Sequence, residues 1–191
     1  NGNPMQKGIF ENNLLQGKWF IFYESGEVKS ELHFKNSKKE GPFKHFFPDG
    51  TLQQEGTHMK GYPHGLIKSY YPTGDIKIEG EYALGILNGK VVKYKENGDI
   101  EELITFKKNI VNGPWQGYYE TGELNYKGKK IKNDFVDTLY VYYKNGNLQR
   151  TCFYENGQLN GEFKAFFESG DLMAEYFFLN GKLHGWYKSY H

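Results

Sequence analysis

The sequence is poor in cysteine and has no surplus of either charge. Its 191 residues contain one cysteine, Cys152, which has no partner for an intramolecular disulfide or a cysteine-based metal site. The 24 basic and 23 acidic side chains nearly cancel. Nucleic acids and anionic membrane surfaces select a clustered excess of lysine and arginine. We therefore predict no nucleic-acid partner and no membrane binding.

Long hydrophobic runs are also missing. No apolar stretch approaches the length of a transmembrane helix, and no signal peptide is visible. Aromatic residues make up 18% of the chain and glycine is frequent, which favours a thin β-layer faced with rings over a thick globular core. The sequence begins with Asn-Gly-Asn-Pro instead of methionine, and on this ground we favour an envelope or secreted location over a cytoplasmic one.

Glycine recurs with a strict 24-residue period. One series is unbroken and consists of Gly2, Gly26, Gly50, Gly74, Gly98, Gly122, Gly146 and Gly170. A second series fails once, where Asp137 replaces glycine, and its members are Gly17, Gly41, Gly65, Gly89, Gly113, Gly161 and Gly185. A period of this length is typical of an array in which each repeat contacts only its neighbours.

The repeat can be numbered from position 1 at Gly17. We then predict a single repeat array over residues 1–191. It comprises a half unit 1–16, full units 17–40, 41–64, 65–88, 89–112, 113–136, 137–160 and 161–184, and a half unit 185–191.

Each repeat has the pattern of a β-hairpin. Position 3 is apolar in every copy and position 12 is a branched aliphatic residue between polar neighbours, which indicates strands with one buried face. A short polar residue precedes the glycine of the first series, as in Ser25 and Gly26, and such pairs tolerate the positive φ of tight turns. We predict strands near residues 17–23 and 26–34, repeated every 24 residues, with almost no helix.

A turn at positions 9 and 10 would set the pairing within the hairpin. Position 7 would pair with 12, position 5 with 14 and position 3 with 16, all on one face. Large residues would then lie opposite glycines, as Phe43 opposite Gly56 and Ile67 opposite Gly80. Positions 19 to 24 are interpreted as a loop to the next hairpin, which gives a continuous meander of about sixteen strands.

Position 6 is aromatic in every copy and defines the aromatic stripe. Its residues are Phe22, Phe46, Tyr70, Tyr94, Tyr118, Tyr142, Phe166 and Tyr190. We expect the stripe on the face opposite positions 3 and 12. Such rings can stack on sugars or receive an extended peptide. Packing between repeats would select the same row of rings, and this structural explanation outweighs the binding one.

Candidate catalytic and metal-binding groups are scattered. The six histidines are scattered over the repeats, and only His64 and His184 share a position; adjacent acids such as Glu101 and Glu102 point to opposite faces of a strand. The sequence contains no nucleophile elbow and no phosphate-binding loop. We therefore predict no enzymatic activity, no metal site and no cofactor.

Three segments carry a family resemblance: GKWFIFYESGEVKSELHFKNSKKEG (17–41), GPWQGYYETGELNYKG (113–128) and GEFKAFFESGDLMAEYFFLNGKLHG (161–185). They resemble the MORN repeat in its bacterial variant form. The resemblance implies an all-β fold, an elongated twisted array of about eight tandem 24-residue antiparallel β-hairpins in one continuous meander. It also implies no catalytic centre and work as a scaffold, and some bacterial relatives carry an antitoxin label. Asp137 departs from the pattern, so we expect a different bend at that junction.

Two other repeat families share part of this pattern. Choline-binding or cell-wall-binding repeats also combine Gly, Trp and Tyr in hairpins, but with a shorter period and denser aromatic runs. The segment YVYYKNGNLQR (140–150) resembles the tyrosine-rich repeats of large secreted toxins. All three families are hairpin arrays, so the predicted fold is the same in each case.

The leading functional hypothesis is a non-catalytic repeat scaffold for protein–protein interaction, including antitoxin-like binding of a partner protein. The alternative is carbohydrate or cell-envelope binding through the aromatic stripe, with a glycan as partner. End-to-end or side-by-side self-association of the array is a further expectation.

Overall fold

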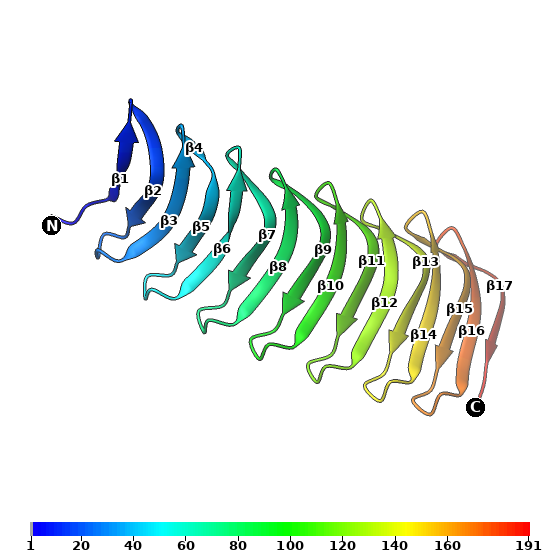
Figure 1. Ribbon diagram of the computed structural model, residues 1–191. Helices are drawn as coiled ribbons and strands as arrows, with labels where there is room; N and C mark the ends of the chain where they lie inside the picture. The colour runs from blue at the N-terminus through cyan, green and yellow to red at the C-terminus, as the bar shows by residue number, and fades with distance from the viewer. Residues whose placement is uncertain (1) are drawn as a thin grey trace. The chain divides into compact units, whose positions relative to one another are not determined.

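The computed structural model describes residues 2–191, and these residues form only strands and turns (Figure 1). The chain divides into an N-terminal unit that ends at Asp99 and a C-terminal unit that begins at Ile100. Within each unit, sequence neighbours pair antiparallel. The predicted all-β fold of tandem antiparallel hairpins is confirmed.

The strands of the N-terminal unit are β1 (Gln6–Glu11), β2 (Leu14–Phe22), β3 (Val28–Lys35), β4 (Lys38–Lys39), β5 (Gly41–Phe46), β6 (Leu52–Met59), β7 (Tyr62–Tyr70), β8 (Ile76–Ala83) and β9 (Ile86–Tyr94). Those of the C-terminal unit are β10 (Ile100–Lys107), β11 (Ile110–Tyr118), β12 (Leu124–Ile131), β13 (Asp134–Tyr142), β14 (Leu148–Glu155), β15 (Gln158–Phe166), β16 (Leu172–Leu179) and β17 (Lys182–Ser189). Both β4 and β5 pair with β3, so they form one interrupted strand and the expected number of about sixteen holds.

The turn that carries the first glycine series, called the wide turn here, spans three residues. The backbone N–H of Tyr23 donates to the carbonyl of Glu27 at 2.9 Å, and the N–H of Gly26 donates to the carbonyl of Tyr23 at 3.0 Å. Gly26 has φ +105°, a conformation that glycine adopts without a steric penalty from a β-carbon. The predicted two-residue turn at positions 9 and 10 is therefore wrong, because position 8 also belongs to the turn.

Most of the predicted register within the hairpins is confirmed. Position 3 pairs with position 16 and position 5 with position 14 in every hairpin for which the pairing is described. Examples are Trp19 with Leu32, Phe43 with Gly56, Ile67 with Gly80 and Trp115 with Gly128, and Ile21 with Ser30. In three of these pairs a large residue therefore lies opposite a glycine, as predicted.

The register next to the wide turn differs from the prediction. Phe22, and not Tyr23, pairs with Val28, and a register shift follows between Ile21 and Phe22. The three-residue turn moves the first pair by one residue, and Lys29 is then left without a Cα partner, as in a β-bulge. Positions 7 and 12 are thus not partners, and position 12 shares a face with position 6.

The second turn of each repeat, called the tight turn here, contains two residues. Asn36 and Ser37 have φ of 50° and 61°, and the flanking Lys35 and Lys38 pair with each other. Two successive residues with positive φ are the mark of a type I′ hairpin turn, whose twist matches that of the strands. Positions 19 and 22 to 24, predicted as loop, therefore belong largely to strands.

Asp137 keeps the backbone conformation of the glycines it replaces. Its φ is 63°, against 66° at Gly17, and it pairs with Tyr154 as Gly17 pairs with Phe34. Aspartate is among the few residues that tolerate the left-handed region. The pairing at this junction follows the other repeats, and the expected difference in bend stays a prediction.

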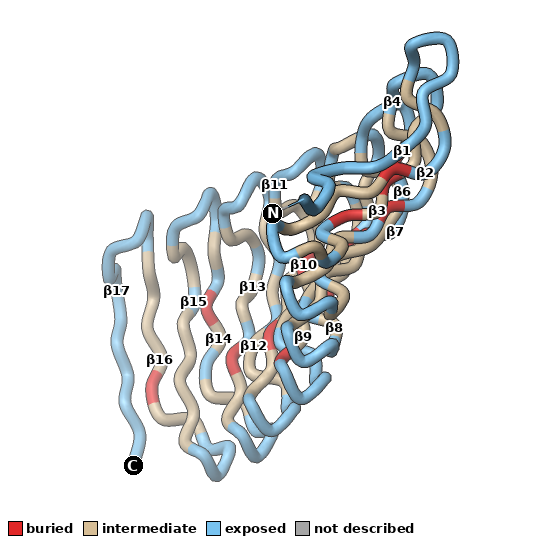
Figure 2. The backbone as a smooth tube through the Cα atoms, turned by 90° about the vertical axis from the view of Figure 1, so that its left-hand side faces the viewer, coloured by how far each residue is buried: buried red, intermediate tan, exposed pale blue. Residues whose placement is uncertain are grey.

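The core of the N-terminal unit is one face of its sheet, called the core face. Trp19, Leu32, Phe43 and Ile67 are each less than 9% exposed and pack together, at positions 3 and 16. Figure 2 shows buried residues along the strands and exposed residues at the turns. A β-carbon on Gly56 would overlap the side chain of Ile67, and one on Gly8 would overlap Trp19, so these two large residues also cover a glycine of the preceding repeat.

Candidate interaction surface

The aromatic stripe lies at the end of the strands that lead into the wide turns. Seven of its residues are the last residue of their strand and are partly buried; they are Phe22, Phe46, Tyr70, Tyr94, Tyr118, Tyr142 and Phe166. Tyr190 follows β17 and is 41% exposed. The fold therefore brings these rings to corresponding places in successive hairpins, as the sequence predicts. Their role in binding stays a prediction.

The stripe shares its face with the charged side chains of positions 4 and 15. The hydroxyl of Tyr70 donates to Glu55 Oε1 at 2.8 Å, and that of Tyr94 donates to Glu79 Oε1 at 2.8 Å. Since position 15 alternates with the buried positions 14 and 16, this is the face opposite the core face. The predicted placement of the stripe opposite position 3 is thus confirmed, whereas its predicted placement opposite position 12 is wrong, because Phe22 pairs with Val28. We call this surface the stripe face.

The hydroxyls of Tyr70 and Tyr94 in the stripe are held protonated. Partial burial, followed by the hydrogen bond and the negative charge of Glu55, raises the pKa of Tyr70 to about 12. Burial and the contact with Glu79 raise the pKa of Tyr94 in the same direction. Each phenol therefore acts as a hydrogen-bond donor that fixes its ring to the preceding repeat.

A lysine lies on the other side of each of these carboxylates. Lys44 Nζ is 3.9 Å from Glu55 Oε2, and Lys68 Nζ is 3.9 Å from Glu79 Oε2. These pairs are partly exposed and each contributes little to stability. Their regular spacing instead gives the stripe face of the N-terminal unit a repeated Lys–Glu–Tyr arrangement.

The contacts of the stripe change where position 15 is not glutamate. The hydroxyl of Tyr118 donates to Gln116 Oε1 at 3.3 Å, and Lys127 Nζ lies 5.6 Å from the ring centre of Tyr142. Phenylalanine at Phe46 has no hydroxyl to donate. The rings are thus a constant feature of the stripe, whereas its polar partners differ between repeats.

A second tyrosine row, at position 7, was missed as a separate feature by the sequence analysis. Its hydroxyls donate to the position-6 carbonyl of the next repeat. The pairs are Tyr23 to Phe46 at 2.7 Å, Tyr71 to Tyr94 at 2.8 Å, Tyr119 to Tyr142 at 2.6 Å and Tyr143 to Phe166 at 2.8 Å. The aromatic pairs at positions 6 and 7 are the sequence signal for this row, which connects successive wide turns.

Removing one of these hydroxyls is expected to weaken the link between repeats. We expect Tyr71→Phe to lower the free energy of unfolding by about 1 kcal/mol, since the carbonyl of Tyr94 loses a partly buried donor. The measurement is chemical denaturation. Tyr62→Phe, at a ring that is 58% exposed, is the control and should change stability by less than about 0.5 kcal/mol. Equal effects of the two substitutions would contradict a linking role.

Two histidines flank Phe43 on the core face. The ring centres of Phe43 and His58 are 4.3 Å apart, those of Phe43 and His45 are 5.3 Å apart, and His45 Nδ1 lies 2.8 Å from Ser30 Oγ. Burial, followed by the positive charge of Lys39 and the proximity of His45, lowers the pKa of His58 to about 4. The folded protein therefore favours neutral His58.

This environment predicts a loss of stability in acid. The pKa of His58 in the folded state lies below its ordinary value of 6.5, so the full stability is present above pH 6.5 and is lost as the pH falls toward 4. Melting temperatures measured between pH 7 and pH 4 should fall less steeply for His58→Gln than for the parent. Parallel curves for the two proteins would show that His58 does not contribute.

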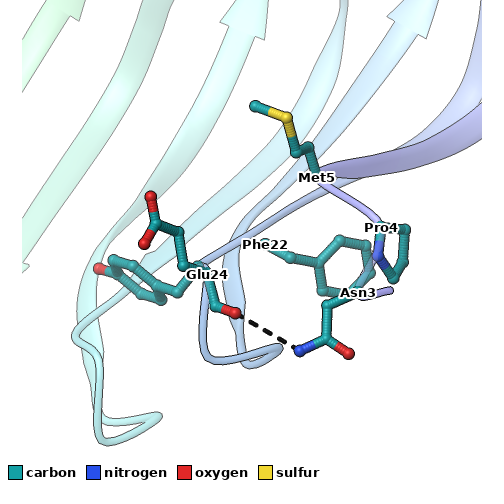
Figure 3. Close-up of a pocket in the computed structure, with 6 residues that line it drawn as sticks. Asn3, Pro4, Met5, Phe22 and Glu24 are labelled. Atoms are coloured by element: carbon teal, nitrogen blue, oxygen red, sulfur yellow. Dashed lines mark hydrogen bonds between the residues drawn. The ribbon is translucent and has the colours of Figure 1, made fainter. Parts of the chain in front are cut away.

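Recesses occur beside the wide turns. One, of about 290 Å³, is lined by Asn3, Pro4, Met5, Phe22, Tyr23 and Glu24, and Asn3 Nδ2 donates to the Glu24 carbonyl at 3.4 Å (Figure 3). Another, of about 400 Å³, is lined by Phe47, Gln53, Gln54, Ser69, Tyr70 and Lys77. Two stripe residues thus contribute to recesses that are lined by aromatic and polar groups.

Residues 2–191 contain no cluster of three or more His, Cys, Asp or Glu side chains that could hold a metal ion. Cys152 is buried, and burial raises the pKa of its thiol, which disfavours the reactive thiolate. The same residues include no helix with the length and apolar character of a membrane span.

Comparison with known proteins gives a family match that extends over most of the chain. The family model described as MORN repeat variant matches residues 15–36, 39–60, 63–83, 87–108, 111–133, 138–156 and 159–180. Each match contains one wide turn with its two flanking strands. No curated protein matches the chain significantly.

Two solved structures show a weak likeness. The crystal structure of the GtfA/B complex bound to UDP and GlcNAc is 10% identical with a TM-score of 0.28, over 68% of this chain and 25% of that one. The structure of TcdB2-TccC3-Cdc42 is 8% identical with a TM-score of 0.17, over 90% of this chain and 13% of that one. The chain spans at most a quarter of the length of either, and these scores carry no argument about fold or function.

Proposed function

Since the chain belongs to the MORN repeat variant family, whose repeats are generally non-enzymatic protein-binding or membrane-binding modules, we propose that it is a non-catalytic scaffold that binds a protein partner through the stripe face. Antitoxin-like binding of a toxin is the specific form of this proposal that the sequence resemblance favours. The observation that supports it is the repetition of the same groups, Lys44, Glu55 and Tyr70 and then Lys68, Glu79 and Tyr94, one repeat apart.

This arrangement suits a protein ligand for two reasons. Tyrosine rings give large contact areas, and tyrosine is enriched among the residues that dominate binding energy at interfaces. Because Glu55 and Glu79 already hold the phenols in place, binding would immobilise few additional side-chain rotamers. The repeats recur every two strands, about 9–10 Å apart, so a partner can engage several of them at once.

The alternative of carbohydrate binding has one supporting observation. The recess of about 400 Å³ combines the rings of Phe47 and Tyr70 with the amides of Gln53 and Gln54 and the hydroxyl of Ser69. Amides and hydroxyls can hydrogen-bond sugar hydroxyls, and an aromatic ring can pack against the face of a sugar.

A photo-crosslinking experiment tests the proposal. A benzoylphenylalanine residue replaces Tyr70 in the full chain, and the matched control carries it in place of Arg150, an exposed residue at position 14, which does not lie on the stripe face. After irradiation in a lysate, a defined protein joined at position 70 and not at position 150 is expected. Identical products at both positions would contradict a role of the stripe face.

The same protein also tests self-association and carbohydrate binding. Cross-linking to a second copy of the chain would support self-association as the use of this face. A glycan array separates the carbohydrate alternative: binding of an oligosaccharide that Gln53→Ala and Gln54→Ala abolish would favour it over the protein partner.

A further inference from the structure

One tight turn in the N-terminal unit has an unfavourable residue at its first position. The residues at position 20 all have positive φ among the described residues, and they are Asn12, Asn36, Lys60, Leu84, Lys108, Lys132, Asn156 and Asn180. Leu84 is the one apolar member, with φ 49° and 43% exposure. A left-handed conformation strains a leucine, and its exposure leaves apolar surface in water. Backbone strain of this kind is often kept where a residue has a functional role.

Exposed apolar residues surround Leu84 on neighbouring hairpins. Position 19 pairs with position 22 on either side of each tight turn, and these pairs are Met59 with Tyr62 and Ala83 with Ile86. Tyr62 is 58% exposed and Ile86 is 42% exposed. A β-carbon on Gly85 would lie 3.3 Å from Tyr62 Cδ1, so the tyrosine ring reaches the turn that carries Leu84. We call Met59, Tyr62, Leu84 and Ile86 the apolar turn patch.

One repeat earlier, the same two positions are basic. Lys35 and Lys38 pair at positions 19 and 22 and are exposed, as is Lys60 at the turn between them and Leu84. Glu40 Oε2 accepts the backbone N–H of Lys60 at 2.7 Å, and Glu81 is the other acid among residues 33–40, 57–64 and 81–88. Four lysines in those segments, Lys35, Lys38, Lys39 and Lys60, therefore exceed the two acids.

Across three consecutive tight turns, the surface formed by these positions changes from basic to apolar. The order along the unit is the lysine pair, then Met59 and Tyr62, then Leu84 and Ile86. Successive hairpins are displaced by two strands, so three turns extend over about 19 Å. An extended peptide of about six residues covers that distance.

We infer that the apolar turn patch and its lysines bind an extended segment of a partner protein that has acidic residues at one end and apolar residues at the other. The carboxylates lie over Lys35 and Lys38, and the apolar side chains lie over Tyr62, Leu84 and Ile86. Opposite charge fixes which end of the segment lies over the lysines, and burial of the exposed apolar side chains supplies the affinity. This site is separate from the stripe face, and the inference does not depend on the proposed function.

Panning a random dodecapeptide display library on the full chain tests this inference. Counter-selection uses the chain with Leu84→Asn and Lys38→Glu, which changes both ends of the surface. The expected outcome is a consensus with two or more acidic residues on one side of a group of apolar ones. A consensus without acidic residues, or no enrichment that depends on the two positions, would overturn the inference.

A synthetic consensus peptide then allows fluorescence anisotropy with single variants. Leu84→Asn and Lys38→Glu should each weaken binding about tenfold or more, as at a well-packed contact. Leu84→Asn should at the same time raise the melting temperature, since asparagine tolerates the left-handed turn. Ile131→Asn, at an exposed residue of the C-terminal unit, is the control and should leave binding unchanged. Equal losses with Ile131→Asn, or vesicles of anionic lipid that bind in place of the peptide, would contradict the peptide site.

Discussion

Replacing Phe43 with alanine is expected to lower the free energy of unfolding by about 3–5 kcal/mol. Phe43 is 3% exposed and belongs to the cluster with Trp19, Leu32 and Ile67. Because the core face is a single layer of side chains, few neighbouring residues can move into the cavity that the substitution leaves. Since the lost burial is local, we expect the N-terminal unit of this variant to unfold before the C-terminal unit.

Chemical denaturation and hydrogen exchange resolved by peptide measure this effect. The matched control is Phe153→Ala, because Phe153 is 39% exposed and its truncation should cost less than about 1 kcal/mol. Protection from exchange should fall in peptides around residues 17–70 for the Phe43 variant and remain unchanged there for the control. Similar stabilities of the two variants would show that the core face does not hold the hairpins together.

The strands and most of their register could be predicted because the repeat supplies the same evidence several times. Position 3 is apolar in every copy. Only one strand register places Phe43 opposite Gly56 and Ile67 opposite Gly80. A side-chain period of two then assigns each residue to a face. This is why the stripe and the core were placed on opposite faces correctly.

The turns could not be predicted as well, because glycine marks a positive φ without fixing the length of the turn. Ser25 and Gly26 look like a two-residue turn, but the hydrogen bond from Tyr23 to Glu27 encloses three residues. Conversely, the two-residue tight turns use Lys60 or Leu84 at a left-handed position where asparagine is expected. In both cases, interactions between strands set the length and backbone conformation of the turn, and they override the conformational preference of the turn residues.

The polar contacts of the candidate surface depend on the register between repeats. Glu55 and Tyr70 are 15 residues apart, and Tyr71 donates to a carbonyl 23 residues further along the chain. Such pairs follow only when the position of one hairpin beside the next is known. Sequence reasoning therefore identified the rings, but not the carboxylates and carbonyls that hold them.

These contacts make the stripe face testable as structure and as a binding surface. The double variant Tyr70→Ser and Tyr94→Ser removes two neighbouring rings and leaves Glu55 and Glu79 without their phenol donors. We expect each substitution to lower the free energy of unfolding by about 1–3 kcal/mol, through lost burial and lost hydrogen bonding. The double variant should then melt well below the parent.

The matched variant is the double change Tyr70→Phe and Tyr94→Phe, which keeps both rings and removes only the hydroxyls. Phe46 shows that the position accepts phenylalanine, so this variant should lose only about 1 kcal/mol at each site. Thermal melting gives the stability, and cross-linking at Lys44, beside Glu55, reports partner binding. If the serine variant melts like the parent while its cross-links disappear, the rings serve binding alone. If the serine variant melts early and the phenylalanine variant retains its cross-links, ring packing holds the repeats in the arrangement that the partner recognises.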